Sequence, residues 1–273
     1  MVKHNESGEL VAEYDGEERF FDDIPITVIS RKKSAVTRAG FPLKGGPGSG
    51  NFGHEGRPGE VGGSGAGVGA AAGKVNENQR AVAGTLYSHA VERAEITTTQ
   101  INDMATTTGG ETEHLQFAVK SENSTARKIA DIQKDAPNLT AEEAALRVTD
   151  SLRYTVVYDD KNFVSNFGQS EAMLTAEGYE RYDNKQANYF GSKEYGYQGY
   201  NTVWQDKQGN TLEIQYHTKD SLRIKEEVTK DYQKFRLAKN PSTKAFILQK
   251  MNDKWENFVP PKNYNELPGV KKP

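Results

Sequence analysis

The stretch GYQGYNTVWQDKQGNTLEIQYHT (196–218) decides how this chain of 273 residues is expected to fold. Two runs rich in β-branched and aromatic residues, 199–204 and 211–217, flank the turn DKQGN. Gly209 in that turn can adopt the positive φ that a tight connection needs. The sequence therefore predicts a β-hairpin here.

The second strand of that hairpin carries polar side chains at alternate positions. Because successive side chains on a strand point to opposite faces, Glu213, Gln215 and His217 should share one face. A carboxylate and an amide in mid-strand are costly to bury without partners. This face is therefore expected either to serve a wet or metal-bearing site or to be an ordinary half-exposed sheet surface. With five histidines in the whole chain, a zinc site is not expected.

Outward from the hairpin, periodicity and capping signals mark further elements. Thr140 with Glu143 forms a capping box, and Gly178 is placed to end a helix. Together these signals predict an α+β fold with a mixed β-sheet of four to five strands flanked by helices. Helices are expected over 76–107 (as one or two), 121–134, 141–149, 162–177, 221–236 and 243–257, and strands over 153–159 and 179–183.

The chain divides by composition into four parts. Residues 1–39 form an N-terminal arm with two extended-looking runs, 9–14 and 24–30. Residues 40–75 form a linker that is expected to be disordered, because 14 of the 26 glycines lie within 40–73 and bring little side chain to bury. Residues 76–258 form the folded domain, and the proline-rich residues 259–273 form an irregular tail.

Bulk properties exclude several classes of protein. The net charge of −3 argues against a broad DNA-coating surface. The absence of cysteine excludes disulfide scaffolds and thiolate chemistry and fits a cytosolic setting. No signal peptide is expected at the N-terminus, and no apolar run of about 18 residues suggests a membrane span.

A cluster of hydroxyls and cations marks the helix expected from residue 121. Lys120 and Ser121 precede it, and Ser124, Arg127 and Lys128 lie within it. Ser124 and Lys128 are four residues apart and share a face. Hydroxyls, ammonium groups and helix N-terminal amides suit phosphate oxygens, whereas the alternative is an ordinary solvated helix start.

In order, these clusters resemble the RelA/SpoT synthetase family. The family pattern runs R-x-K-S, S-x-x-x-K, an aspartate ahead of G-x-R, G-Y-x-S-x-H, and E-x-Q-x-R-T. The order and rough spacing agree over about 120 residues, and five motifs in order are more specific than any one of them. The matches here are Lys120-Ser121, Ser124 with Lys128, Asp150 with Arg153, Gly196-Tyr197, and Glu213 with Gln215 and Thr218.

The resemblance implies a nucleotidyltransferase-like domain that transfers pyrophosphate from ATP to the 3′-hydroxyl of a nucleotide or a tRNA end. It implies that Asp150 and Glu213 are catalytic and hold Mg²⁺, with Glu213 also able to take the proton of the attacking hydroxyl. The remaining residues would bind substrates. On the donor side these are Lys120, Ser121, Ser124, Arg127, Lys128 and Arg153; on the acceptor side they are Tyr197, which would stack on a base, with Asn201, Gln215 and His217.

The sequence departs from the family pattern at four positions. Ala118 replaces the arginine of R-x-K-S, which contacts ATP in the family, and Arg127 is a candidate substitute. Gly199 and Asn201 replace the serine and histidine of G-Y-x-S-x-H, and His217 replaces the arginine of E-x-Q-x-R-T. The acceptor is therefore left open and is not restricted to GDP or GTP. No His-Asp dipeptide is present, so the family's hydrolase activity is not expected.

A second function stays open. The tract GGPGSGNFGHEGRPGEVGGS (45–64) resembles one found in tailed-phage head-associated proteins. It suggests a phage protein in the host cytoplasm or the virion, with capsid or portal partners and a degenerate nucleotide-binding domain. No supporting arrangement is found for ADP-ribosyl transfer or RNA cleavage.

Overall fold

The computed structural model describes residues 75–182, 185–192 and 194–271, together with the backbone of three strands near the N-terminus. These strands are β1 (Val2–His4), β2 (Leu10–Tyr14) and β3 (Glu17–Phe20), which pair antiparallel in that order. The run expected at 9–14 is therefore a strand. The run at 24–30 and the glycine-rich tract lie outside the described residues.

The main sheet is mixed and confirms the predicted α+β class. Its order is β10-β7-β8-β9-β5-β4, with β6 paired to β8. β5 and β9 run parallel, as do β10 and β7, and the other pairs are antiparallel. The strands are β4 (Glu111–Glu113), β5 (Arg153–Val157), β6 (Glu180–Arg181), β7 (Ala187–Asn188), β8 (Tyr200–Gln205), β9 (Thr211–His217) and β10 (Val270–Lys271). The count exceeds the four to five expected because the sequence did not predict β4, β7 and β10, which have only two or three residues each.

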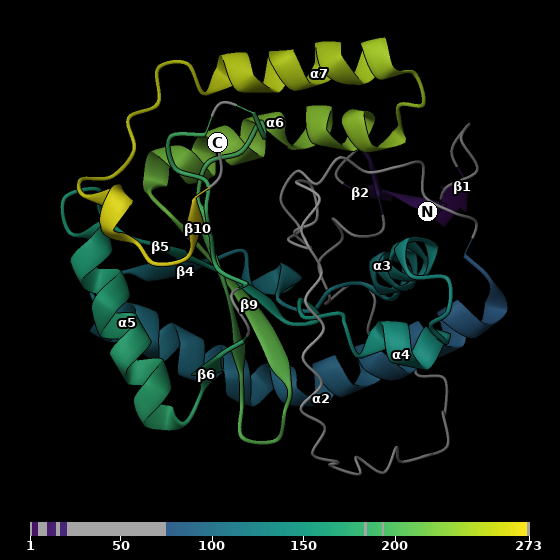
Figure 1. Cartoon of the computed structure of the whole chain (residues 1–273), viewed down its shortest axis with the longest axis horizontal. Helices are drawn as coiled ribbons and strands as arrows, with labels where there is room; N and C mark the ends of the chain where they lie inside the picture. Colours follow the sequence, from purple (N-terminus) through teal and green to yellow (C-terminus); the bar gives the residue numbers. More distant parts are fainter. Residues whose placement is uncertain are drawn as a thin grey trace.

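The helices follow the expected order (Figure 1). They are α2 (Glu77–Thr107), α3 (Glu122–Asp135), α4 (Ala141–Ala145), α5 (Phe163–Glu177), α6 (Lys219–Leu237) and α7 (Pro241–Lys254), with 3-10 turns at Leu115–Phe117 and Tyr264–Glu266. Residues 76–107 thus form one helix, not two. α4 ends four residues before the predicted limit.

The capping and turn residues identified in the sequence lie at the ends of these elements in the structure. Thr140 and Glu143 make both hydrogen bonds of a capping box at the start of α4. Gly178 ends α5 with φ of 91°, and Gly209 turns the β8–β9 hairpin with φ of 85°. Glycine adopts such angles without the penalty that a Cβ imposes.

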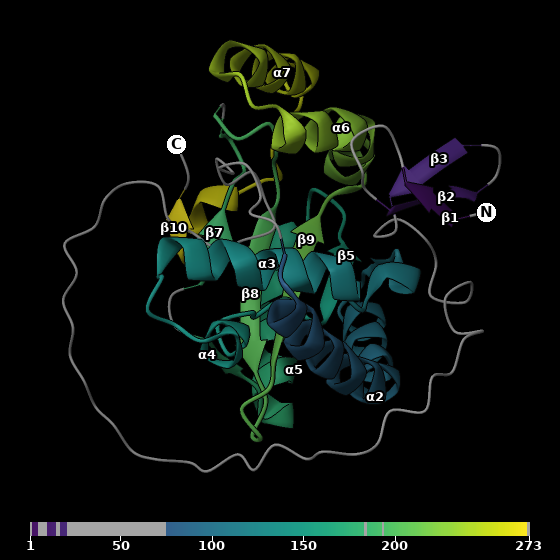
Figure 2. The ribbon, with the colours of Figure 1, turned by 90° about the vertical axis from the view of Figure 1, so that its right-hand side faces the viewer.

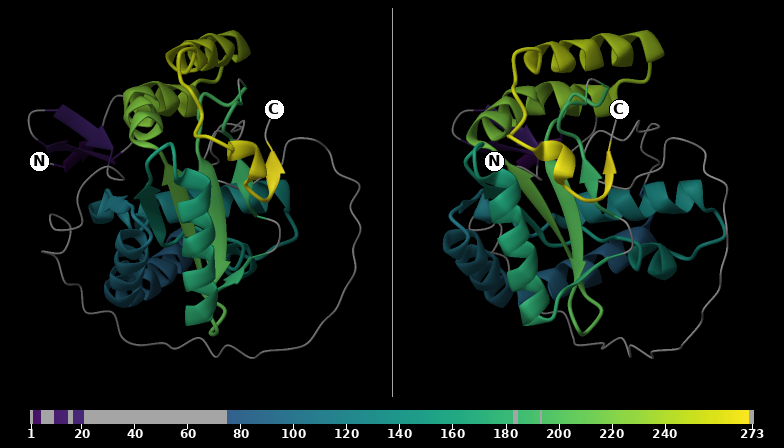
Figure 3. Two further views of the ribbon diagram at one scale, coloured as in Figure 1. Left: turned by 90° about the vertical axis from the view of Figure 1, so that its left-hand side faces the viewer. Right: turned by 60° about the vertical axis from the view of Figure 1, so that its left-hand side comes forward.

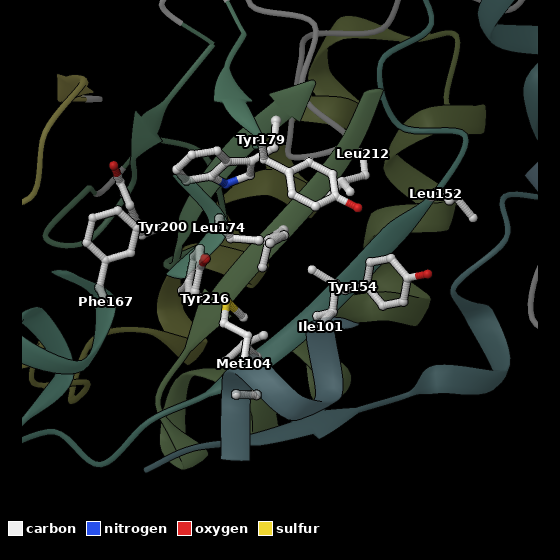
Figure 4. Close-up of a cluster of buried hydrophobic side chains, with 14 of the residues drawn as sticks. Ile101, Met104, Leu152, Tyr154, Phe167, Leu174, Tyr179, Tyr200, Leu212 and Tyr216 are labelled. Atoms are coloured by element: carbon white, nitrogen blue, oxygen red, sulfur yellow. The ribbon is translucent and has the colours of Figure 1, made fainter. Parts of the chain in front are cut away.

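The main core lies on one face of the sheet, against α2 and α5. Leu212 and Tyr216 of β9 point into it (Figure 4), and Ile214 of the same strand belongs to this cluster. α2 adds Ile101 and Met104, while α5 adds Phe163, Phe167 and Leu174. Because side chains alternate along β9, its other positions are left for the opposite face.

Three smaller clusters complete the body: two lie between helices, and the third contains Ala187, Tyr189 and Tyr197. α3 and α4 pack on α2 around Ile129 and Val148, and α6 and α7 pack together around Phe235 and Trp255 (Figures 2 and 3). The C-terminal segment is more ordered than the expected irregular tail, since Leu267 is buried in the main core and β10 joins the sheet. Among the described residues, no helix is long and apolar enough to cross a membrane.

Candidate active site

A short antiparallel pairing brings the first cation to the first carboxylate. Val119 bridges Leu152, the amide of Lys120 donates to the carbonyl of Ser151 at 3.0 Å, and the amide of Arg153 donates to the carbonyl of Ala118 at 2.7 Å. This pairing sets the Lys120 Nζ 2.9 Å from the Asp150 Oδ2. Both side chains are buried, with 10% and 6% exposed.

The Lys120–Asp150 pair is ionised although it is buried. Burial alone raises the pKa of the Asp150 carboxyl, but the charges of Lys120, Lys128 and Arg153 and the hydrogen bond from Lys120 together lower that pKa well below its usual range. Burial lowers the pKa of the Lys120 ammonium, and the charge of Asp150 offsets part of this shift. The other carboxylate oxygen, Oδ1 of Asp150, is buried and has no hydrogen-bond partner.

Glu213 lies on β9, the strand next to β5. It pairs with Arg153 across the parallel β5–β9 ladder, and its amide donates to the carbonyl of Leu152 at 2.9 Å. The residue is only 2% exposed. Asp150 lies three residues before β5 begins, so the two carboxylates come from neighbouring segments of the sheet.

Residues from α6 join Glu213 on this polar face. Nζ of Lys225 donates to Oε1 of Gln215 at 2.8 Å, and Nε2 of Gln215 donates to Oε1 of Glu213 at 3.3 Å. Burial, followed by the charge of Arg153, lowers the pKa of Lys225 to about 8. The alternate side chains of β9 thus form a partnered polar face, as its spacing predicted.

The predicted phosphate-binding residues gather at the start of α3. Oγ of Ser121 caps the helix by accepting from the amide of Ser124 at 3.2 Å. Oγ of Ser124 accepts from Nη2 of Arg127 at 2.9 Å, one turn along the helix. The charge of Lys128 acts on Asp150, so this helix face borders that carboxylate. The helix N-terminal amides add a partial positive charge there.

The predicted acceptor-side residues also meet. The hydroxyl of Tyr197 lies 2.7 Å from Oδ1 of Asn201 and 3.0 Å from Nε2 of His217, and Nδ1 of His217 lies 2.9 Å from Oγ of Ser221. Burial, with a smaller contribution from the charge of Lys225, holds the pKa of His217 well below its usual value, so the ring is neutral. Tyr197 is 8% exposed, which leaves little of its ring open for a base to stack on.

The carboxylates fit a magnesium ion that keeps much of its hydration. No group of three or more histidine or acidic residues gathers among the described residues, so a fully protein-ligated metal site is absent from that part of the chain. Mg²⁺ usually binds one or two carboxylates plus substrate phosphates and several waters. Asp150 supplies an oxygen without a partner, and Glu213 supplies the second carboxylate.

Two contributors to the site were missing from the predicted set. Ser221 and Lys225 both come from α6, and each binds a predicted residue of β9. The spacing T-x-x-S at Thr218–Ser221, which forms the capping box of α6, was a usable signal for Ser221. Ala118, where the family has arginine, is 2% exposed and part of the main core.

Comparisons with known proteins give matches among solved structures. No protein-family model matches the sequence, and no curated protein matches it. Among solved structures, the chain is similar to the type VI effector Tas1, from its complex with its immunity protein, at 19% identity and a TM-score of 0.38 over 63% of this chain and 93% of that one. It is also similar to small alarmone synthetase 1 from Bacillus subtilis at 18% identity and a TM-score of 0.39, over 62% and 86% of the two chains.

A second alarmone synthetase gives the same result. Small alarmone synthetase 2 from Bacillus subtilis is 12% identical with a TM-score of 0.39, over 62% of this chain and 88% of that one. Identities and TM-scores this low do not carry the chemistry of these proteins over to this chain. The chemistry of the site follows from its own residues.

Proposed function

We propose that this protein transfers pyrophosphate from ATP to the 3′-hydroxyl of a nucleotide or a tRNA end, and that it acts as a synthetase without hydrolase activity. The observation that carries the proposal is the buried Lys120–Asp150 pair, in which Oδ1 of Asp150 is unpartnered, with the buried Glu213 on the strand next to β5. Burying two carboxylates among several cations is costly unless the site serves charged ligands.

The donor side binds the triphosphate. Lys120, Lys128 and Arg153 all act electrostatically on Asp150, so an anion that enters here meets three cations at once. The N-terminus of α3, capped by Ser121, offers backbone amides to phosphate oxygens. Asp150 and Glu213 would hold magnesium, which would neutralise the charge that develops on the phosphates.

In the transfer, one bond forms, one bond breaks, and the attacking hydroxyl loses one proton. The acceptor 3′-oxygen forms a bond to the β-phosphorus of ATP, the bond from that phosphorus to the α,β-bridging oxygen breaks, and AMP leaves. Glu213 takes the proton of the attacking hydroxyl, because Asp150 is already engaged by Lys120 and Glu213 is the second carboxylate at this end of the ladder. The hydrogen bond from Gln215, itself bound by Lys225, fixes the orientation of the Glu213 carboxylate.

The test is a transfer assay on the full chain with MgCl₂ and ATP labelled at the β-phosphate. ADP, GDP and deacylated tRNA serve as separate acceptors. We expect AMP to form in step with a labelled 3′-diphosphate. Asp150→Asn and Glu213→Gln should each lower the rate by a factor on the order of a hundred or more, as loss of electrostatic stabilisation does elsewhere. Asp103→Asn, an exposed carboxylate on α2, is the matched control and should leave the rate unchanged.

One observation favours a second candidate, a phage head-associated protein with a degenerate nucleotide-binding domain. Ala118 lies in the core, so the arginine that would contact ATP has no equivalent at that position. This candidate predicts that ATP binds, measured by calorimetry, but that no acceptor is modified and that Asp150→Asn changes only affinity. It also predicts that the protein copurifies with phage particles.

A further inference from the structure

Three of the four departures from the family pattern meet around one side chain. Gly199, Asn201 and His217 belong to two separate motifs of the pattern but all contact Tyr197. Tyr197 is also held by ring contacts, edge to face, with Tyr189 at 5.2 Å and with His217 at 5.5 Å between centroids. The departures therefore form one packed unit.

Gly199 is a glycine because Tyr197 and His217 fill the space beside it. A Cβ at position 199 would lie 2.6 Å from the hydroxyl oxygen of Tyr197 and 2.7 Å from Cε1 of His217. Real Cβ atoms are essentially never that close to a neighbour. A serine at position 199 would therefore force one of the two rings to move.

The polar atoms of this unit form one directional hydrogen-bond chain. A tyrosine hydroxyl has one proton, so it cannot donate to both Asn201 and His217. The structure places Oδ1 of Asn201 toward the hydroxyl, where it accepts from Tyr197, but the oxygen and nitrogen of an amide can be exchanged by a flip. With Nδ2 facing the hydroxyl and donating to it, Tyr197 donates to Nε2 of His217 and Nδ1 donates to Oγ of Ser221. Oγ of Ser221 then donates to the carbonyl of Thr218, at 3.2 Å. This orientation also gives a partner to Nδ2 of Asn201, which otherwise has none.

The loop that carries Tyr197 is also fixed from the other side. The amide of Gly196 donates to Oδ1 of Asn252 on α7 at 2.7 Å. Gly196 has φ of 60°, and a Cβ there would lie 2.7 Å from Cε of Met251. Tyr197 therefore lies between an anchored loop and the polar face of β9.

We propose that Gly199, Asn201 and His217 act together as positioning residues that hold Tyr197 in its buried position, and that this arrangement, instead of an exposed tyrosine ring, determines which acceptor the site takes. The inference rests on the proposed function for its consequence on the acceptor. The arrangement itself can be tested without any activity.

The first test compares two amides at position 217. In His217→Gln the terminal amide reaches the place of Nε2 and keeps a contact with Tyr197. In His217→Asn the amide lies near the place of Nδ1 and keeps only the contact with Ser221. We expect His217→Asn to raise KM for the acceptor (ADP, GDP or deacylated tRNA, whichever is turned over) by about tenfold, the effect of losing one buried hydrogen bond, while His217→Gln stays within about threefold of wild type. KM for ATP should change in neither. Equal effects of the two variants, or a parallel rise in KM for ATP, would overturn the proposal.

The second test needs no substrate. In ¹⁵N spectra of the wild-type chain, the Nε2 resonance of His217 should move in Tyr197→Phe, which removes the hydroxyl proton that Nε2 accepts. It should stay in place in Tyr179→Phe, which removes a hydroxyl that donates to Gln100 at 2.9 Å in another part of the molecule. A resonance that Tyr197→Phe leaves unmoved would overturn the chain of hydrogen bonds.

Stability supplies a third, independent measurement. Gly199→Ser should lower the melting temperature in the wild-type chain and lower it by less than half as much in a His217→Ala background, where space has opened. Equal losses in both backgrounds would show that position 199 is not coupled to His217. If the spectra and melting data hold while no acceptor is modified, the proposed function fails and the positioning of Tyr197 stands.

Discussion

At the scale of single residues, the contribution of Asp150 to the stability of the protein depends on the cations around its carboxylate. Because its pKa is lowered in the folded state, its ionised form stabilises the protein above the unfolded pKa of about 3.9, and this contribution is lost as the pH falls toward the folded pKa. Asp150→Asn leaves Lys120 buried without its partner and should cost about 3–5 kcal/mol near pH 7. The difference from wild type should shrink below about pH 4. Urea unfolding at several pH values between 3 and 7 measures it, and a difference that stays constant would contradict the prediction.

Lys225 should affect stability in a separate, alkaline range of pH. Its folded pKa of about 8 lies below the unfolded value of about 10.4, so the cost of burying its charge is full below pH 8 and is relieved as the pH rises. Lys225→Met removes that cost. The stability of the variant relative to wild type should therefore fall between about pH 8 and 10, by on the order of 1 kcal/mol per pKa unit before screening by solvent is allowed for. Paired denaturant titrations test this, and a pH-independent difference would be the contrary result.

At the scale of elements, the N-terminus of α6 links the hairpin to the site. Thr218 follows β9 directly and accepts from the amide of Ser221, whose Oγ accepts from the amide of Thr218. Thr218→Ala should cost about 1 kcal/mol of unfolding free energy, as for other helix caps. Thr140→Ala removes the equivalent cap of α4 and should cost about the same. Only Thr218→Ala should also raise KM for the acceptor, because α6 carries Ser221. A kinetic effect of equal size in both variants would argue against this link.

Many of the helix ends were predictable from the sequence because their capping signals are local. Thr140 with Glu143 and Gly178 identified helix ends within a few residues of where they lie. The two-residue strands β7 and β10 were not predictable, because they are very short and pair with each other across about 80 positions of the chain.

The candidate site was likewise predictable only in part. The alternation of Glu213, Gln215 and His217 predicted a polar face, and motif order placed Lys120 near Asp150. The sequence did not reveal that Lys225 would reach Gln215, since this contact depends on how α6 crosses β9. It also could not show that Tyr197 would be buried.

At the scale of the whole molecule, the three larger cores, among the residues whose burial is described, are built from residues between Ala83 and Leu267. We predict that these cores suffice for folding, so that a chain shortened to residues 75–273 melts within about 3 °C of the full protein, the shift that corresponds to about 1 kcal/mol at this size. It should also keep its KM for ATP. Calorimetric scanning and the transfer assay measure both. A loss of more than about 10 °C would mean that earlier residues contribute to the stability of the folded body.

The space beside Gly199 also limits the order in which this sequence can change. A serine at position 199 is blocked while His217 and Tyr197 occupy their present places, but an amide or smaller residue at position 217 opens the way for it. Evolution between this sequence and the pattern G-Y-x-S-x-H with E-x-Q-x-R-T is therefore epistatic, with position 217 changing before position 199. Libraries that vary both positions at once should recover the Gly199→Ser change mainly in chains that have already lost the histidine.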